Sequence, residues 1–283
     1  MLDTLGKLVT QRCFHHPIFV LGVGRSGTTA LSEGLGKHPQ ILYMLNEIPS
    51  ISHISSIPYL YEFGDRKDYY LRVLNVNKEY LYQSLRRLCF ETVAGKHYGL
   101  KRLMQALYHG DIFLLNKRYW CAKAFPNFEG SQAILSLYPQ TKFIHIIRSG
   151  CDVVQSRMQF PGFSHLGFNA HCRVWAENVE KYYYVSELKS AMQVRHEQLV
   201  SQPERVFQEV FAFIGIKYHN APANFARKTL VNPLDEPTHR GVDVKNILNA
   251  REPSYTNWSS EQRVQFKEIC GAAMYKVGYE VPF

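Results

Sequence analysis

The stretch Gly22–Thr29, GVGRSGTT, follows the apolar run PIFVL at residues 17–21 and precedes ALSEGLG at residues 30–36. A short apolar run that ends in glycines is typical of a buried strand in a parallel sheet. Such a strand, turn and helix present backbone N–H groups and a helix N-terminus to an anion. The segment therefore predicts an anion-binding loop, and a plain glycine-rich connection is the alternative.

The loop departs from the pattern that binds nucleoside triphosphates. That pattern, G-x-x-x-x-G-K-[ST], uses its lysine on the phosphates and its hydroxyl on magnesium. The spacing from Gly22 to Gly27 fits, but Thr28 stands at the lysine position. Arg25 adds a planar guanidinium, which can bind two oxygens of a phosphate or a sulfate.

The strand expected to carry the magnesium ligand also differs. A P-loop NTPase needs an apolar strand that ends in aspartate. The clearest apolar strand, KFIHII at residues 142–147, is followed by Arg148. A second cationic partner for a phosphate stands where the metal ligand belongs, which argues against an ATPase or a kinase.

Apolar runs and helical periodicity alternate along the chain. Predicted strands and helices follow one another, so we predict an α/β fold with a parallel sheet flanked by helices. The absence of a linker composition predicts one P-loop-like domain over residues 1–283. Residues 50–118 are predicted to be a helical insertion that shapes a pocket, and residues 219–257 a lid or binding loop. The predicted strands are PIFVLGV, QILYMLNEIP, YWCAKAFP, KFIHII and AMQVRHE.

Three serines are predicted to begin helices. Ser149 and Asp152 have the S-x-x-D spacing of a capping box. Ser201 precedes Pro203 and is expected to cap the helix that follows. Ser259 is expected to start the last helix.

Composition indicates a globular protein with an excess of positive charge. Thirty-three Lys and Arg against 24 Asp and Glu give a formal net charge of +9, which suits an anionic ligand but also favours solubility. No nucleic-acid-binding motif accompanies this charge. The six scattered cysteines are expected to be buried, reduced thiols, and no metal-ligand spacing is present. The chain has neither a signal peptide nor an apolar run of membrane-spanning length, so we expect a cytoplasmic protein with no membrane partner.

Two separated motifs resemble those of the sulfotransferase family. They are RSGTT at Arg25–Thr29 after a strand, and Arg148 with Ser156 in the spacing R-x7-S. The first resembles the family's loop for the 5′-phosphosulfate of 3′-phosphoadenosine 5′-phosphosulfate (PAPS), and the second its site for the 3′-phosphate. The resemblance implies that PAPS is the donor, that 3′-phosphoadenosine 5′-phosphate (PAP) is the product and that no metal is required. The donor-binding residues that it implies are Gly24, Arg25, Ser26, Gly27, Thr28, Thr29, Arg148 and Ser156.

The resemblance continues to residue 280, apart from residues 50–118 and much of 219–257. VRHEQLVSQPERVFQEVFAFIGI and the closing helix are also similar to family segments. The cytosolic branch, however, has lysine at the position of Arg25 and an adenine-stacking tryptophan at that of Ala30. His196 stands where the family often has an adenine-contacting tyrosine; it is expected either to stack on adenine or to be a satisfied histidine. Arg240 begins a two-residue match to a 3′-phosphate loop.

Sulfuryl transfer requires cations that stabilise negative charge and a base that accepts the acceptor's proton. Sulfuryl transfer resembles phosphoryl transfer, in which catalysis rests on positioning and charge stabilisation. Arg25 and Lys123 are the candidate cations. Related enzymes have a strand lysine followed by proline two residues later, whereas Pro126 follows Lys123 by three. The alternative for Lys123 is a surface lysine whose aliphatic stem lies on apolar surface. Glu47, which closes a predicted strand, is the candidate base, and a helix-capping or salt-bridged carboxylate is its alternative. His53 is the second candidate base.

The leading hypothesis is a soluble PAPS-dependent sulfotransferase that acts on a hydroxyl, or an amine, of a small molecule such as a secondary metabolite. The small-molecule acceptor is inferred from the missing membrane anchor. The alternatives are a nucleotide or metabolite kinase with a degenerate loop and a non-catalytic nucleotide-binding protein. No nucleic-acid partner is expected, and the sequence leaves the oligomeric state unassigned.

Overall fold

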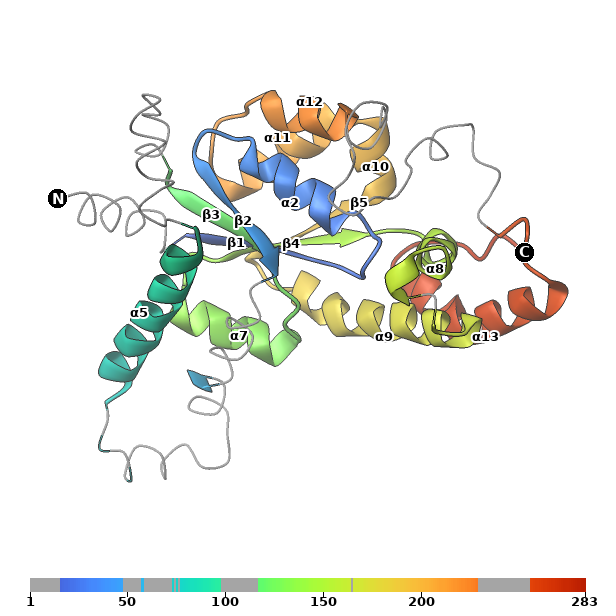
Figure 1. Ribbon diagram of the computed structural model, residues 1–283, viewed down its shortest axis with the longest axis horizontal. Coiled ribbons are helices and arrows are strands. Elements are labelled where there is room, and N and C mark those ends of the chain that lie inside the picture. The colour runs from blue at the N-terminus through green and yellow to red at the C-terminus, as the bar shows by residue number, and fades with distance from the viewer. Residues whose placement is uncertain are drawn as a thin grey trace. The chain divides into compact units, whose positions relative to one another are not determined.

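The described strands form one sheet. The structure is a computed structural model that describes residues 16–47, 57–58, 73, 75, 77–97, 117–163, 165–228 and 255–283. In this part of the chain the strands lie in the order β2-β3-β1-β4-β5 (Figure 1). They are β1 (Pro17–Leu21), β2 (Ile41–Glu47), β3 (Tyr119–Lys123), β4 (Lys142–Ile147) and β5 (Ala191–Arg195).

The pairing and burial of β1 confirm the α/β prediction. β3 pairs in parallel with both β1 and β2. The PIFVL segment is buried along its whole length, which explains its continuous apolar sequence. All five predicted strands are present, and helices flank the parallel sheet.

The chain forms two compact units that alternate along the sequence. Unit 1 comprises Met1–Val20 and Leu35–Phe143, and unit 2 comprises Leu21–Gly34 and Ile144–Phe283. The chain thus passes from unit 1 to unit 2 at the end of β1 and again within β4. That residues 1–283 form one domain remains a prediction.

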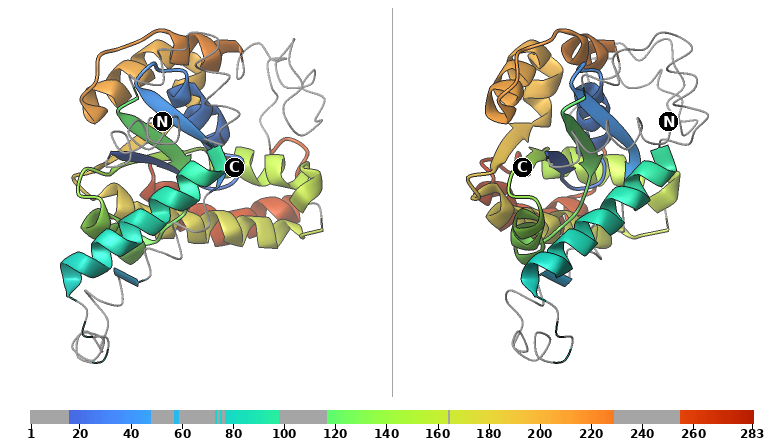
Figure 2. Two further views of the ribbon diagram at one scale, coloured as in Figure 1. Left: turned by 60° about the vertical axis from the view of Figure 1, so that its left-hand side comes forward. Right: turned by 90° about the vertical axis from the view of Figure 1, so that its left-hand side faces the viewer.

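In the described part of the chain, unit 1 contains β2, β3, most of β1 and the helices α5 (Lys78–His97) and α7 (Phe128–Leu137). Phe19 of β1 packs edge-on against Trp120 of β3, with ring centroids 5.3 Å apart. Helices α5 and α7 lie side by side (Figures 1 and 2). Arg86 of α5 donates from Nε to the carbonyl oxygen of Leu137 at 2.7 Å, so a cation stabilises the carboxyl end of α7. Helix α5 is the long helix that the structure describes within the predicted 50–118 insertion; most of the remainder of that insertion lies outside the described residues.

Unit 2 contains β5, most of β4 and α2 (Thr28–Gly36), and the helices that follow β4. Helix α8 (Gly150–Met158) follows β4 directly, and α9 (Phe168–Ser186) and α13 (Ser260–Lys276) run side by side (Figure 1). The other helical elements are η2 (Pro161–Phe163), α10 (His196–Ser201), α11 (Pro203–Ile214) and α12 (Ala221–Ala226).

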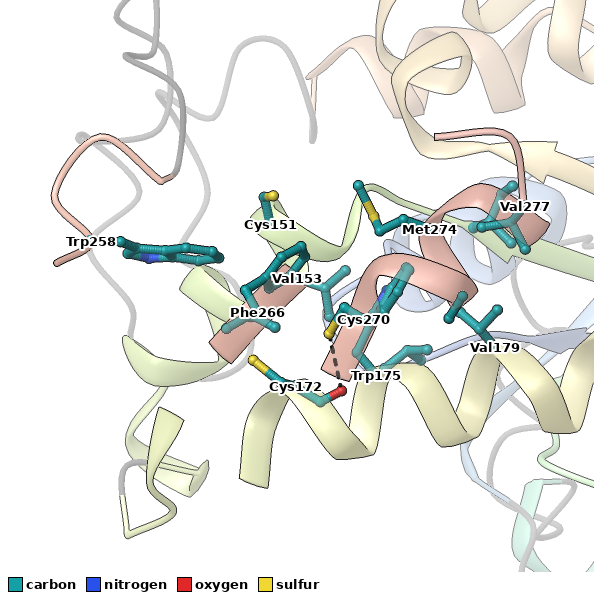
Figure 3. Packing of buried hydrophobic residues seen from close by; sticks show 14 residues of the cluster. Cys151, Val153, Cys172, Trp175, Val179, Trp258, Phe266, Cys270, Met274 and Val277 are labelled. Carbon is teal, nitrogen blue, oxygen red and sulfur yellow. Dashed lines mark hydrogen bonds between the residues drawn. The ribbon is translucent and has the colours of Figure 1, made fainter. Parts of the chain in front are cut away.

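Apolar side chains from α8, α9 and α13 converge in the core of unit 2 (Figure 3). The apolar face of α9 is buried at Cys172, Trp175 and Val179. Cys270 of α13 donates from Sγ to the carbonyl oxygen of Cys172 at 3.4 Å. The five cysteines in the described part of the chain are buried and free, as predicted, and Cys13 lies outside it.

The predicted helix starts have mixed outcomes. Ser259 forms the expected cap on α13: its Oγ accepts from Gln262 N at 3.1 Å, and Gln262 Oε1 accepts from Ser259 N at 2.9 Å. The prediction of a capping box at Ser149 is wrong, because the Ser149 side chain makes no capping hydrogen bond with α8. Ser201 belongs to α10 instead of capping α11; its Oγ donates to the carbonyl oxygen of Glu197.

The prediction of a long loop over residues 219–257 is also wrong in part, because this segment contains α12. Residues 229–254 of that segment lie outside the described residues.

Candidate functional site

The loop between β1 and α2 requires glycine at two positions. Gly22 has φ 156°, and a Cβ placed there would lie 2.4 Å from the carbonyl oxygen of Ile146, on β4. Gly27 has φ 94°, in the left-handed region, and a Cβ there would lie 2.7 Å from Cδ2 of His196. Only glycine permits these conformations and close approaches without strain. The two glycines therefore fix the path of the loop against β4 and the start of α10.

Arg25 has an unusual backbone conformation, and its side chain contacts neighbouring elements. Its φ is 82°, which non-glycine residues seldom adopt. Arg148 donates from Nη1 to the carbonyl oxygen of Arg25 at 3.2 Å. The Nε of Arg25 in turn donates to Oγ of Ser156 at 3.2 Å, and its guanidinium carbon lies 4.7 Å from the centre of the Phe160 ring. These contacts connect the loop directly with β4 and α8.

The two motifs that resemble phosphate sites thus meet in unit 2. Arg25 comes from the loop, whereas Arg148 follows β4 and Ser156 lies on α8. Arg148 Nε also lies 3.6 Å from Oδ2 of Asp152, one helical turn further on. Asp152, predicted to belong to a capping box, instead forms an ion pair that orients Arg148.

The loop hydroxyls have different surroundings. Ser26 is buried at 1% exposure, and its Oγ has no hydrogen-bond partner among the described residues. Thr28 is buried and Thr29 is exposed; Ser32 Oγ donates to the carbonyl oxygen of Thr29 at 3.0 Å. A buried hydroxyl without a partner costs about 1–3 kcal/mol, so an anion oxygen that accepts from Ser26 would stabilise the loop.

A carboxylate that sequence reasoning missed holds the start of α8. Glu197 accepts from the backbone N–H of Ser149 at Oε1 (3.1 Å) and from the Tyr279 hydroxyl at Oε2 (2.7 Å). The Arg195 guanidinium lies 4.5 Å from the centre of the Tyr279 ring. Burial, followed by the neighbouring Glu197 charge, raises the pKa of Tyr279, which keeps its hydroxyl a donor. The signal for this network was the RHE sequence at Arg195–Glu197, where β5 ends and α10 begins; the sequence predicted no role for Glu197.

His196, Arg195's neighbour and the first residue of α10, lies against Gly27 of the loop. Contact with adenine stays a prediction for this ring. Ala30, at the position of the family's tryptophan, is 7% exposed.

The candidate catalytic residues of unit 1 lie on neighbouring strands. Glu47 is the last residue of β2, and its Cα register partner on β3 is Lys123, the last residue of that strand. The register shifts between Tyr43 and Glu47. Lys123 is buried at 8% exposure, so it is not a surface lysine. His53, Arg240 and Gly241 lie outside the described residues.

The family model described as the sulfotransferase family matches residues 17–220. The chain belongs to the sulfotransferase family. The match begins at β1 and includes the loop, β4, α8 and β5, so it covers the elements that carry both motifs. Membership in this family removes the basis for the kinase alternative.

Two curated relatives are protein-tyrosine sulfotransferases. The sequence is 25% identical over 210 residues to protein-tyrosine sulfotransferase 1 of Danio rerio. This alignment covers 72% of this chain and 54% of the relative. The sequence is 22% identical over 211 residues to the protein-tyrosine sulfotransferase of Drosophila melanogaster. That alignment covers 72% of this chain and 39% of the relative. The chain therefore spans only about half, or less, of these relatives.

Solved sulfotransferase structures share the fold. Mouse sulfotransferase SULT7A1 complexed with PAP aligns with a TM-score of 0.54 and 16% identity, over 95% of this chain and 87% of that one. The sulfotransferase domain from the curacin biosynthetic pathway aligns with a TM-score of 0.51 and 17% identity, over 94% of this chain and 99% of that one. At these identities the likeness concerns the fold.

The described residues contain neither a membrane-spanning helix nor a cluster of metal ligands. None of their helices has both the length and the apolar character needed to cross a membrane. None of their His, Cys, Asp and Glu side chains gather in groups of three or more that could hold a metal ion.

Proposed function

We propose that the protein is a PAPS-dependent sulfotransferase whose donor site is formed by the loop of unit 2 together with Arg148 and Ser156. The hydrogen bond between Arg25 Nε and Ser156 Oγ, at 3.2 Å, carries this proposal. It joins two motifs that are 131 residues apart in sequence and that resemble the sites for the two ends of one nucleotide. PAP in the SULT7A1 structure, which shares the fold, supports the same donor.

The described side chains suit a donor with phosphate at both ends. Arg25 and Arg148 supply guanidinium groups, which bind phosphate and sulfate through paired hydrogen bonds. Ser26 has a buried hydroxyl without a partner among the described residues, and the helix that starts at Thr28 directs its N-terminus to the loop. When bound, PAPS supplies the activated sulfuryl group.

The roles of the protein's own residues follow from the charge that such a transfer creates. Arg25 and Lys123 are proposed to stabilise the negative charge that develops on the leaving phosphate. Glu47 is proposed to accept the proton of the acceptor hydroxyl. Its placement at the carboxyl end of β2 supports this role, because ligands of open α/β sheets bind beside the carboxyl ends of the strands.

Two classes of acceptor are proposed. The first is a hydroxyl, or an amine, of a small molecule such as a secondary metabolite, as the sequence analysis predicts. The second is the phenolic hydroxyl of tyrosine in a protein, which the two protein-tyrosine sulfotransferases among the relatives favour.

A transfer assay with sulfur-labelled PAPS tests the function and separates the acceptors. The purified chain is incubated with labelled donor and either a panel of small phenols, alcohols and amines or a set of tyrosine-containing peptides. Label in one set assigns the acceptor class. PAP binding without transfer to any acceptor would favour the non-catalytic nucleotide-binding alternative.

A further inference from the structure

Arg157, for which the sequence predicted no role, is a buried cation beside the loop. It lies on α8 immediately after Ser156 and is 5% exposed. A Cβ placed on Gly24 would lie 3.4 Å from Nη1 of Arg157 and 3.9 Å from Cζ of Phe163. The guanidinium therefore lies directly against the first half of the loop, where Gly24 itself is exposed.

No acidic group in the described part of the chain neutralises Arg157. Its Nε has no hydrogen-bond partner there, and its described contact is with the Phe163 ring, whose centre lies 4.2 Å from the guanidinium carbon. Burial lowers the pKa of Arg157 from its ordinary value, but a guanidinium stays charged. Burial, followed by the Arg157 charge, lowers the pKa of the buried His171. The described contacts of the Arg157 guanidinium thus supply no negative charge.

The aromatic residues after α8 link this cation with Arg25. The Arg25 guanidinium lies over the Phe160 ring at 4.7 Å, and Arg157 lies over Phe163 at 4.2 Å. The centroids of the two rings are 5.3 Å apart. Arg25 and Arg157 thus each make a cation–π contact with one of two neighbouring phenylalanines. Neither contact supplies a negative charge.

A charge buried without a partner destabilises the fold that contains it. An anion bound by the loop would offset this cost, because it would lie next to the uncompensated guanidinium in surroundings of low dielectric. We propose that Arg157 supplies, from beside Gly24, a further countercharge for the phosphate or sulfate group that the loop binds. This inference rests on the proposed function, since it concerns the 5′ end of the same donor.

Matched variants separate this role from a structural one. Arg157→Met removes the charge but keeps a long apolar side chain, Arg157→Lys keeps the charge, and Arg173→Met removes one charge from an exposed position on α9. Calorimetry measures the affinity of each variant for PAP, for adenosine 5′-monophosphate and for adenosine 3′-monophosphate. Thermal unfolding of the ligand-free variants measures their stability.

We expect Arg157→Met to weaken the binding of PAP and of the 5′-monophosphate by about tenfold or more, the range of a lost charge-assisted interaction. Binding of the 3′-monophosphate should change by less than about twofold, because that nucleotide has no 5′ group for Arg157 to neutralise. The ligand-free Tm should stay the same or rise, because a buried uncompensated charge is removed. Arg157→Lys should retain most of the affinity, and Arg173→Met all of it.

Two results would overturn the inference. One is a PAP affinity of Arg157→Met equal to that of the wild type. The other is a lower ligand-free Tm together with an equal loss for all three nucleotides, which would make Arg157 a structural residue. If Arg157→Met does not fold, Arg157→Gln replaces it, and failure of both to fold would also make the residue structural. A wild-type protein that binds no PAP would overturn the proposed function itself, whereas normal wild-type binding with an unaffected Arg157→Met would overturn this inference alone.

Discussion

The candidate residues of unit 2 are joined by side-chain contacts, whereas those of unit 1 are joined by strand register. In unit 2, Arg25 contacts Ser156 through its side chain and Arg148 through its carbonyl oxygen. In unit 1, Glu47 and Lys123 end neighbouring parallel strands as Cα partners. A loop that must surround an anion needs cations, glycines and N–H groups from several elements. A base and a cation at the edge of a sheet need only two adjacent strand ends.

This difference implies different effects of mutation in the two units. Changes in the candidate site residues of unit 2 should act on donor affinity, because these residues are proposed to bind the nucleotide. Changes at the strand ends of unit 1 should act on turnover, because these residues are proposed to stabilise charge and accept a proton during the transfer.

The largest effect is expected for Glu47→Gln. Glutamine keeps the shape of the side chain but cannot accept the acceptor's proton, so turnover should fall by about two to four orders of magnitude. PAP affinity should change little. Steady-state kinetics with labelled PAPS, together with calorimetric titration of PAP, measures both quantities.

His53→Ala is the control for this experiment. If Glu47→Gln keeps near-normal turnover while His53→Ala loses it, the base is His53. If both variants remain active, neither residue is the base, as for an amine acceptor that is already neutral.

A smaller effect, on binding, is expected for Arg148→Ala. Loss of a charge-assisted pair with the 3′-phosphate should cost about 1.5–3 kcal/mol, or about 10- to 150-fold in the Kd for PAP. Arg173→Ala, which removes an exposed arginine of the same unit, should leave the Kd unchanged. Equal affinity of Arg148→Ala and the wild type in calorimetry would remove Arg148 from the donor site and weaken the contrast between the units.

The smallest effect, on stability alone, is expected for Ser259→Ala. This change removes one hydrogen bond of the capping box on α13 and should lower the free energy of unfolding by about 1 kcal/mol. Ser260→Ala, one residue further on and also exposed, is the matched control. Chemical denaturation measures the difference, and the PAP affinity of both variants should equal that of the wild type.

The fold was predictable where the signal is local. The apolar run at residues 17–21 and the glycines after it predict β1 and the loop, because burial on both faces and positive φ each restrict the residue types. The capping box of Ser259 was predictable for the same reason. The box of Ser149 was not, because Glu197, 48 residues away, accepts its backbone N–H instead. A local pattern cannot reveal a partner supplied by another element.

The candidate site shows the same limit. Arg25, Arg148 and Ser156 were recognisable from two motifs in the right order, and the structure brings them together. Arg157 was not recognisable, because its contact with Gly24 arises only when α8 packs beside the loop. The division into two units was equally hidden, since its boundaries fall at the end of β1, within α2 and within β4, where no change in composition occurs.

A comparison of PAP with magnesium-ATP in thermal unfolding tests the central claim, that unit 2 binds a nucleotide with phosphate at both its 3′ and 5′ ends. A ligand that binds only the native state stabilises it by RT ln(1 + [L]/Kd), which is about 2.7 kcal/mol at a hundredfold excess over Kd. We predict a clear rise in Tm with PAP and a much smaller one with magnesium-ATP, because Arg148 and Ser156 are proposed to bind the 3′-phosphate that ATP lacks. An equal or larger rise with magnesium-ATP would contradict the account.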